Sequence, residues 1–260
     1  MVVESAINKT ATRAIANAMY RHTFGIVVDG KFGAEGRELG SGIGVLWKST
    51  YLILTADHVV DKTPFERLYF LLPDEALEFE DDDIASGSRT VKVRKRFALE
   101  KPEIIEDDDD LAAFILPTQA QETGRNHFYR LDEHHVAPSE AEQIGVLGYP
   151  ADARIPVGAN YMATLYLAFG QMGHPASSEF ADSDSRISIN YPTQLTVDPP
   201  GLSGSGLWLP TSGNEGLWKP TIQLVGLTTI HDQVAQKLVG YKVENLIEFL
   251  SANDDRISKN

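Results

Sequence analysis

Short runs of apolar and β-branched residues recur along most of the chain, and turn-forming residues separate them. Before residue 118 we predict six strands: Phe24–Val28, Ile43–Trp47, Tyr51–Thr55, Leu68–Leu72, Thr90–Arg96 and Leu111–Leu116. After residue 142 we predict six more: Ile144–Tyr149, Tyr161–Phe169, Ile187–Tyr191, Leu207–Leu209, Ile222–Ile230 and Leu238–Val243. Asp29-Gly30 and Gly40-Ser41-Gly42 are typical of turns. Two sets of short strands predict an all-β fold with two six-stranded antiparallel β-barrels.

Helical periodicity is confined to the two ends of the chain. Apolar residues recur at helical spacing from Ile7 to Met19, and Ser5 is the predicted N-cap. A second, shorter amphipathic helix is predicted from Glu244 to Leu250. The predicted organisation is a helical extension (1–22), a first barrel (23–117), a polar linker (118–142), a second barrel (143–243) and a C-terminal helix with its tail (244–260).

The composition narrows the class of protein. The chain has no cysteine, which excludes disulfides, thiolate metal sites and cysteine nucleophiles. With 37 acidic against 23 basic residues, the net charge of −14 argues against a nucleic-acid partner. The first twenty residues do not resemble a signal peptide, and no apolar run is long enough to span a membrane. We therefore expect a cytoplasmic protein with no membrane partner.

Much of the negative charge lies in two runs, Glu78–Asp83 and Glu106–Asp110, which we interpret as solvated loops. The first run lacks the glycine-punctuated pattern of a calcium loop. Apart from His58, the histidines show no metal-ligand spacing. We expect neither a metal ion nor a cofactor.

Three short segments carry the residue types of a catalytic triad. One strand leads into Thr55-Ala56-Asp57-His58, and Asp110, with Asp109 as the alternative, precedes the strand that begins at Leu111. A glycine-rich turn, Gly201-Leu202-Ser203-Gly204, contains the candidate nucleophile. Ser203 is favoured over Ser205 because it has glycine two residues before and one after. The chain order His, Asp, Ser, and the absence of a Gly-x-Ser-x-Gly motif here, argue against an α/β-hydrolase.

These motifs resemble those of the chymotrypsin/trypsin-like serine peptidases, in particular the cysteine-free bacterial members. Thr55-Ala56-Asp57-His58 is similar to the family's Thr-Ala-Ala-His, Asp110-Leu111-Ala112 to its Asp-Leu-Ala, and Gly201–Gly204 to its Gly-x-Ser-Gly. The resemblance spans about residues 22–250 and implies a serine endopeptidase that forms an acyl-enzyme with protein substrates. It implies His58 as base, Asp110 as its orienting acid and Ser203 as nucleophile, with the N–H groups of Gly201 and Ser203 as the oxyanion hole.

The resemblance also implies a substrate pocket. Counting back from Ser203, its floor includes Val197 and Asp198, and one wall is the strand Thr228-Thr229-Ile230-His231, which would bind the substrate backbone. Asp198 would favour a basic residue before the scissile bond, unless Val197 forms the floor. The acidic residues from Glu106 to Asp109 would favour basic residues upstream of the cut.

Leu202 departs from the family pattern, because many secreted members have an acid there that pairs with the N-terminus released on activation. We therefore expect control by a regulatory protein, a sensor partner or an allosteric loop, as in bacterial defence effectors. Two other functions stay open. One is a catalytically silent binding module with this fold, and the other is an esterase-type acyl hydrolase.

Overall fold

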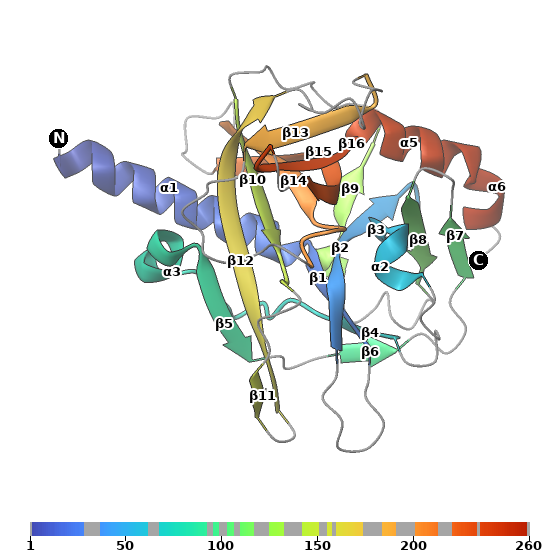
Figure 1. Cartoon of the computed structure of the whole chain (residues 1–260), viewed down its shortest axis with the longest axis horizontal. Helices are drawn as coiled ribbons and strands as arrows, with labels where there is room; N and C mark the ends of the chain where they lie inside the picture. The colour runs from blue at the N-terminus through green and yellow to red at the C-terminus, as the bar shows by residue number, and fades with distance from the viewer. Residues whose placement is uncertain are drawn as a thin grey trace.

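The protein consists of two β-sheets with a helix at each end of the chain (Figure 1). The computed structural model describes residues 2–28, 37–61, 68–92, 96–98, 103–106, 110–116, 125–132, 142–150, 155–157, 160–173, 184–190, 201–212, 220–232 and 235–258. The two ends of the chain lie on opposite sides of the molecule (Figure 1).

The first sheet is an open half-barrel in the order β6-β4-β1-β2-β3-β8-β7. Its strands are β1 (Thr23–Val28), β2 (Arg37–Trp47), β3 (Thr50–Ala56), β4 (Leu68–Leu71), β6 (Arg96–Ala98), β7 (Glu103–Glu106) and β8 (Leu111–Ile115). These strands pair antiparallel, whereas β9 (Tyr129–Leu131) pairs with β2 in parallel. Residues that share one face of the sheet, such as Phe24 of β1, Phe70 of β4 and Phe114 of β8, pack into one apolar cluster.

The second sheet closes into a barrel. Its strands are β10 (Gln143–Gly148), β12 (Asn160–Gly173), β13 (Arg186–Asn190), β14 (Gly206–Ser212), β15 (Pro220–Asp232) and β16 (Lys237–Lys242). They follow the order β10-β14-β15-β16-β13-β12, and β10 also pairs with β12, which completes the ring. Two further strands, β11 (Ile155–Val157) and β5 (Ser88–Lys92), pair with β12.

The predicted all-β, chymotrypsin-like fold is confirmed, with three differences, the first of which is that the first sheet is a half-barrel and not a closed barrel. Each sheet has eight strands, although six of those in the second sheet form its closed ring. The strand predicted over Thr90–Arg96 is two strands in different sheets, because β5 crosses to the second sheet and β6 stays in the first. Strand periodicity indicates that a segment is extended, but it does not specify which sheet supplies the hydrogen-bonding partner.

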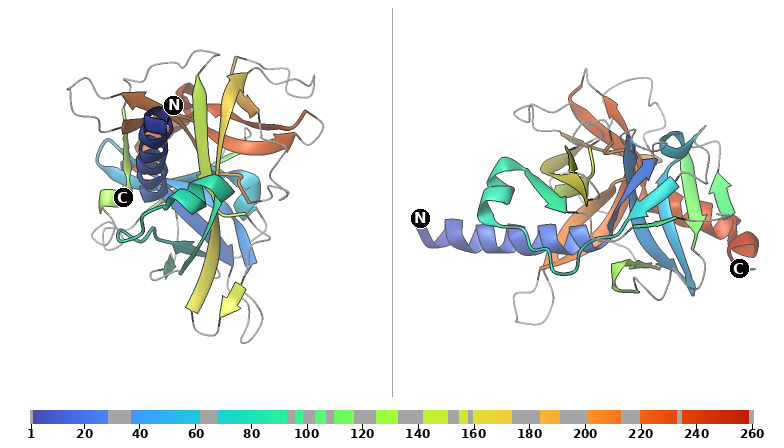
Figure 2. Two further views of the ribbon diagram at one scale, coloured as in Figure 1. Left: turned by 90° about the vertical axis from the view of Figure 1, so that its left-hand side faces the viewer. Right: turned by 90° about the horizontal axis from the view of Figure 1, so that it is seen from below.

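The N-terminal helix α1 (Val2–Arg21) projects away from the barrels, and Ala16, Met19 and Tyr20 in its last turns are buried (Figure 2). Because α1 begins at Val2, the N-cap predicted at Ser5 is wrong. At the other end, α5 (Val243–Ala252) and α6 (Asp254–Ile257) close the chain, as predicted for a C-terminal helix. None of the helices in the described ranges has the length and apolarity to cross a lipid bilayer.

Two local predictions are corrected by the structure. The acidic run near residue 80 is not a loop: it forms the capping box of helix α3 (Asp81–Ser86), in which the Glu80 N–H donates to Asp83 Oδ2 at 2.7 Å. Gly40-Ser41-Gly42 is not a turn but part of β2, and Ser41 is fully buried. In both cases, residues of types that are common in loops belong to a helix or a strand, which contacts with other segments stabilise.

The predicted linker contains structured residues. A short 3-10 helix, η2 (Arg125–His127), precedes β9, and His127 and Phe128 are buried. This part of the linker therefore belongs to the packed interior beside β2.

Candidate active site

His58 and Asp110 are neighbours because β3 and β8 are paired. Their register places Ala56 opposite Leu111, so the residues just beyond these two positions meet at one end of the ladder. His58 lies in the four-residue helix α2 (Asp57–Val60) that directly follows β3, and Asp110 directly precedes β8. Two segments about fifty residues apart therefore converge through strand pairing alone.

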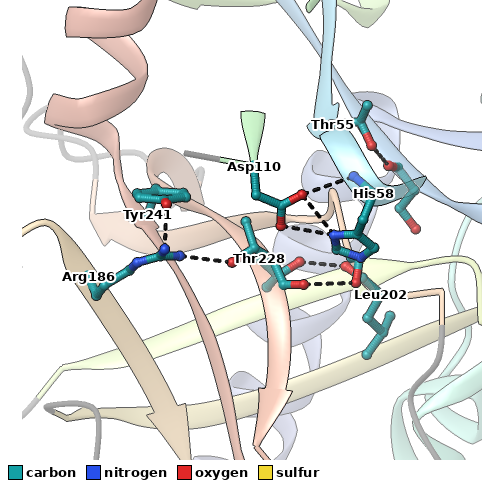
Figure 3. Close-up of polar contacts among 10 residues, drawn as sticks. Thr55, His58, Asp110, Arg186, Leu202, Thr228 and Tyr241 are labelled. Carbon is teal, nitrogen blue, oxygen red and sulfur yellow. Dashed lines mark hydrogen bonds and ion pairs between the residues drawn. The ribbon is translucent and has the colours of Figure 1, made fainter. Parts of the chain in front are cut away.

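The Asp110 carboxylate holds the imidazole of His58 (Figure 3). Both carboxylate oxygens lie 2.9 Å from Nδ1 of His58, and Oδ1 also accepts the His58 backbone N–H at 2.9 Å. Asp110 has a left-handed backbone with φ of +59°, and its carbonyl oxygen accepts the Asp57 N–H at 3.1 Å. Backbone strain of this kind is common at functional sites, where the surroundings impose the conformation. The arrangement leaves Nε2 of His58 as the nitrogen that faces a reactant.

The acidic surroundings favour the charged form of His58. The hydrogen bond from Asp110 raises the pKa of His58 against the opposing effect of burial, and the negative charges of Asp110 and Asp57 add to the rise. The His58 side chain is 49% exposed and that of Asp110 31%, so solvent partly screens the pair. Burial raises the pKa of Asp57, and its Oδ1 is buried with no hydrogen-bond partner among the described residues.

The serine turn has a conformation that requires glycine. Gly201 has φ of +99° and Gly204 has φ of +83°, values that residues with a side chain rarely adopt. A Cβ on Gly204 would lie 2.0 Å from the carbonyl oxygen of Ser41, so a side chain there would displace β2. The two glycines therefore allow the turn to sit directly against the first sheet.

Ser41 fixes the serine turn from the first sheet. Its hydroxyl donates to the Gly201 carbonyl at 2.9 Å and accepts the Tyr149 N–H at 2.8 Å. Its backbone N–H donates to the Ser203 carbonyl at 3.0 Å. One buried serine thus connects β2, the turn and the end of β10.

Thr228 fixes the turn from the second barrel. Its carbonyl accepts the Gly204 N–H at 2.7 Å, its N–H donates to Ser205 at 2.8 Å, and its hydroxyl donates to the Leu202 carbonyl (Figure 3). The Leu202 side chain is 1% exposed and belongs to the apolar core of the second barrel. Apolar burial of Leu202 and hydrogen bonds from Thr228 hold the turn in place.

Ser203 and the helix of His58 meet over β2. A Cβ built on Gly40 would lie 2.9 Å from a methyl group of Val59 and 3.1 Å from the Ser203 carbonyl. The Ser203 side chain is partly buried, and its hydroxyl donates to the Thr229 carbonyl at 3.1 Å rather than to His58. Ser205 is fully buried and its hydroxyl has no partner among the described residues. Of the two serines, only Ser203 is open to a reactant.

The N–H groups predicted to form the oxyanion hole have no acceptor in the part of the chain that the structure describes. Within the described ranges, neither the Gly201 N–H nor the Ser203 N–H donates a hydrogen bond. Two unpaired donors beside a partly buried serine are the chemical requirement for stabilising an oxyanion.

The predicted substrate-binding strand is the last part of β15. Thr228 and Thr229 are buried, whereas Ile230 and His231 are partly buried. The register with β16 shifts between Thr228 and Ile230, so Thr229 occupies an irregularity of the strand. Val197 and Asp198, and the acids 107–109 of the predicted charge-selective loop, lie outside the described residues.

Two contributors to the site were missed at the sequence level. Ser41 was interpreted as a turn residue, although small residues on both sides of a serine also permit close approach of a second segment. Asp57 replaces the second alanine of the family's Thr-Ala-Ala-His, which is the signal that could have identified it. Among the described residues, no group of three or more His, Asp and Glu side chains is arranged to hold a metal ion.

Comparisons with known proteins support the fold. No family model and no curated protein sequence matches the chain. A similar solved structure concerns the coupled folding and binding, driven by aromatic interactions, of the intrinsically disordered VPg protein of Sesbania mosaic virus. It has a TM-score of 0.50 and 14% identity, and the match covers 88% of this chain and 90% of that chain.

A second similar structure is the serine protease domain of the Sesbania mosaic virus polyprotein. It has a TM-score of 0.48 and 15% identity, over 88% of this chain and 92% of that chain. At 14% identity the first structure shows a similarity of fold alone, and any argument for function comes from the residues of the site.

Proposed function

We propose that the protein is a serine peptidase that cleaves protein substrates through an acyl-enzyme. The observation that carries the proposal is the His58 imidazole, held through Nδ1 by both oxygens of Asp110, on a helix that meets the turn of Ser203 at Gly40. This is the set of groups that activates a serine hydroxyl, and it arises from three segments far apart in the sequence.

The proposed mechanism gives each group one task. Nε2 of His58 removes the proton of Ser203 as Oγ attacks the substrate carbonyl, and Asp110 stabilises the imidazolium that forms. The Gly201 and Ser203 N–H groups stabilise the oxyanion, and each such donor is typically worth about 3 kcal/mol. His58 then protonates the leaving amine, and water hydrolyses the acyl-enzyme by the same steps.

The proposed reaction requires a change in the hydrogen bond of the nucleophile. Ser203 Oγ donates to the Thr229 carbonyl, and in the proposed reaction it would donate to His58 instead. Catalytic hydrogen bonds often form only when substrate is bound. A substrate backbone that pairs with β15 would compete for the Thr229 carbonyl and release the hydroxyl toward His58.

The proposal is tested with a fluorophosphonate probe, which reacts with activated serines. We expect the wild-type protein to be labelled and Ser203→Ala to be unlabelled, with Ser205→Ala as the matched control that keeps labelling. Absence of wild-type labelling would refute the proposal and favour a silent binding module.

Matched peptide and ester substrates then separate a peptidase from an esterase. We expect cleavage of both substrates, because the acyl-enzyme chemistry accepts either leaving group. Cleavage of the ester alone would favour the esterase alternative. The cytoplasmic setting, the bacterial type, and a regulatory or sensor partner stay predictions.

A further inference from the structure

Arg186 is a partly buried cation on β13, and its side chain contacts Thr229 of β15 and Tyr241 of β16 (Figure 3). Its guanidinium carbon lies 3.6 Å from the centre of the Tyr241 ring. Nη1 donates to the Thr229 hydroxyl at 3.1 Å, and Nη2 donates to the Tyr241 hydroxyl. Stacking and two hydrogen bonds hold the side chain in one orientation.

The positive charge of Arg186 has no acidic partner in the part of the chain that the structure describes. Its partners are two neutral hydroxyls, and no carboxylate among the described residues forms an ion pair with it. Arg89, whose side chain is 19% exposed, shows the usual arrangement, because it is paired with Asp83. A guanidinium has five N–H donors, so Arg186 keeps donors for a further acceptor. A partly buried charge without a counterion is unfavourable until a ligand supplies one.

Arg186 is close to the proposed nucleophile. A single residue connects them, because the Thr229 hydroxyl accepts from Arg186 while the Thr229 carbonyl accepts from Ser203 at 3.1 Å. Thr229 lies at the irregularity of β15, and such bulges redirect side chains next to active sites. A peptide that binds along this part of β15 therefore passes the guanidinium.

We propose that Arg186 selects peptide substrates with an acidic side chain, Asp or Glu, at one position along β15. The inference rests on the proposed peptidase function and names its substrate class. A carboxylate fits the planar guanidinium through paired hydrogen bonds, and the Tyr241 ring holds that plane in place. The acidic residues Glu106 to Asp109 predict the opposite preference, so one set of substrates distinguishes the two.

The test uses fluorogenic peptides that carry Glu, Gln or Lys at each position around the cut. We expect the wild-type protein to show kcat/KM at one position roughly 10- to 100-fold higher for Glu than for Gln, the range for a hydrogen bond to a charged group. Arg186→Gln should lose this ratio, and the matched control Arg89→Gln should keep it. A wild-type ratio near one, or a ratio that persists in Arg186→Gln, overturns the proposal.

Two further measurements separate selectivity from other causes. A purely structural role of Arg186 would reduce fluorophosphonate labelling and lower kcat/KM for Glu and Gln peptides alike, which contradicts the proposal. Binding of the same peptides to Ser203→Ala, measured by fluorescence anisotropy, reports the preference without catalysis. If the wild-type protein is not labelled but peptide binding still shows a Glu preference that depends on Arg186, the peptidase function fails and the role of Arg186 is supported. If it is labelled and shows no such preference, only the role of Arg186 fails.

Discussion

Replacing Ser41 by alanine tests whether the first sheet holds the serine turn in its reactive conformation. The change removes one oxygen that is fully buried between β2, the turn and the end of β10. It deprives the Gly201 carbonyl of a donor at 2.9 Å and the Tyr149 N–H of an acceptor at 2.8 Å. The Ser41 backbone contact with the Ser203 carbonyl is unaffected by the substitution itself.

The expected cost follows from the two groups left in the interior. A buried polar group that loses its partner costs about 1–3 kcal/mol, so the pair amounts to roughly 2–6 kcal/mol. The turn can reduce this cost by rotating the Gly201 carbonyl toward solvent. That rotation would also turn the adjoining peptide group and misplace the oxyanion donors. The cost therefore lowers the free energy of unfolding, the reactivity of Ser203, or both.

Two assays measure the two forms of the loss. Thermal or urea unfolding gives the change in the free energy of unfolding, and the rate of fluorophosphonate labelling gives the change in serine reactivity. We expect Ser41→Ala to be labelled at least about tenfold more slowly, since each donor of an oxyanion hole is worth about 3 kcal/mol.

Ser188→Ala is the matched control. Ser188 is also fully buried, and its hydroxyl donates to the Gly173 carbonyl at 2.7 Å between β13 and β12. We expect this variant to lose stability by about 1–3 kcal/mol and to keep the wild-type labelling rate. Wild-type labelling of Ser41→Ala, or equal losses in both variants, would refute the role of Ser41 as the anchor of the turn.

Two pH-dependent predictions follow from shifted histidines. Burial lowers the pKa of His22 to about 4, from an ordinary value of 6.5. Between pH 4 and pH 6.5 the unfolded chain therefore binds more protons than the folded protein. The free energy of unfolding falls as the pH is lowered through this range, by roughly 2 kcal/mol between pH 7 and pH 5. His22→Asn should remove this share of the pH dependence in urea unfolding, and an unchanged dependence would contradict the assignment. After the hydrogen bond from Asp110, the charge of Asp57 also raises the pKa of His58. Asp57→Asn should therefore shift the acidic limb of kcat/KM to lower pH, since the neutral base forms earlier, and a limb that stays in place would exclude this coupling.

Local patterns were sufficient to predict the strands and the order of the candidate site. Apolar runs such as Leu111–Leu116 are long enough, and bounded sharply enough, to indicate a buried strand. His58 and Asp110 stand next to such strands, so their approach needed only that β3 and β8 pair. Ser203 stands between glycines, and the structure gives those glycines the left-handed backbone that an exposed turn of this kind requires.

Long-range contacts account for what local patterns did not indicate. The residues around position 90 are extended whether they join the first sheet or the second, and it is the pairing of β5 with β12 that places them in the second. The acidic residues near position 80 suit a solvated loop and a helix cap equally well, so their polarity does not distinguish the two. In the structure they cap helix α3, and Asp83 forms an ion pair with Arg89. Ser41 is a small polar residue in the sequence, and it becomes an anchor because the Gly201 carbonyl lies across from it.

By itself, the sequence determined that this protein is built from short strands, that it carries a histidine, an acid and a serine in a fixed order, and that glycines surround the serine. Hydrophobic periodicity and backbone sterics act over a few residues, so they can be recognised without the fold. Only the tertiary structure decided that Asp110 holds His58, that Leu202 is buried in the core of the second barrel, and that Arg186 faces Thr229 with no acidic partner among the described residues. Those features depend on side-chain distances and burial between segments far apart in the chain, which exist only once the strands have paired.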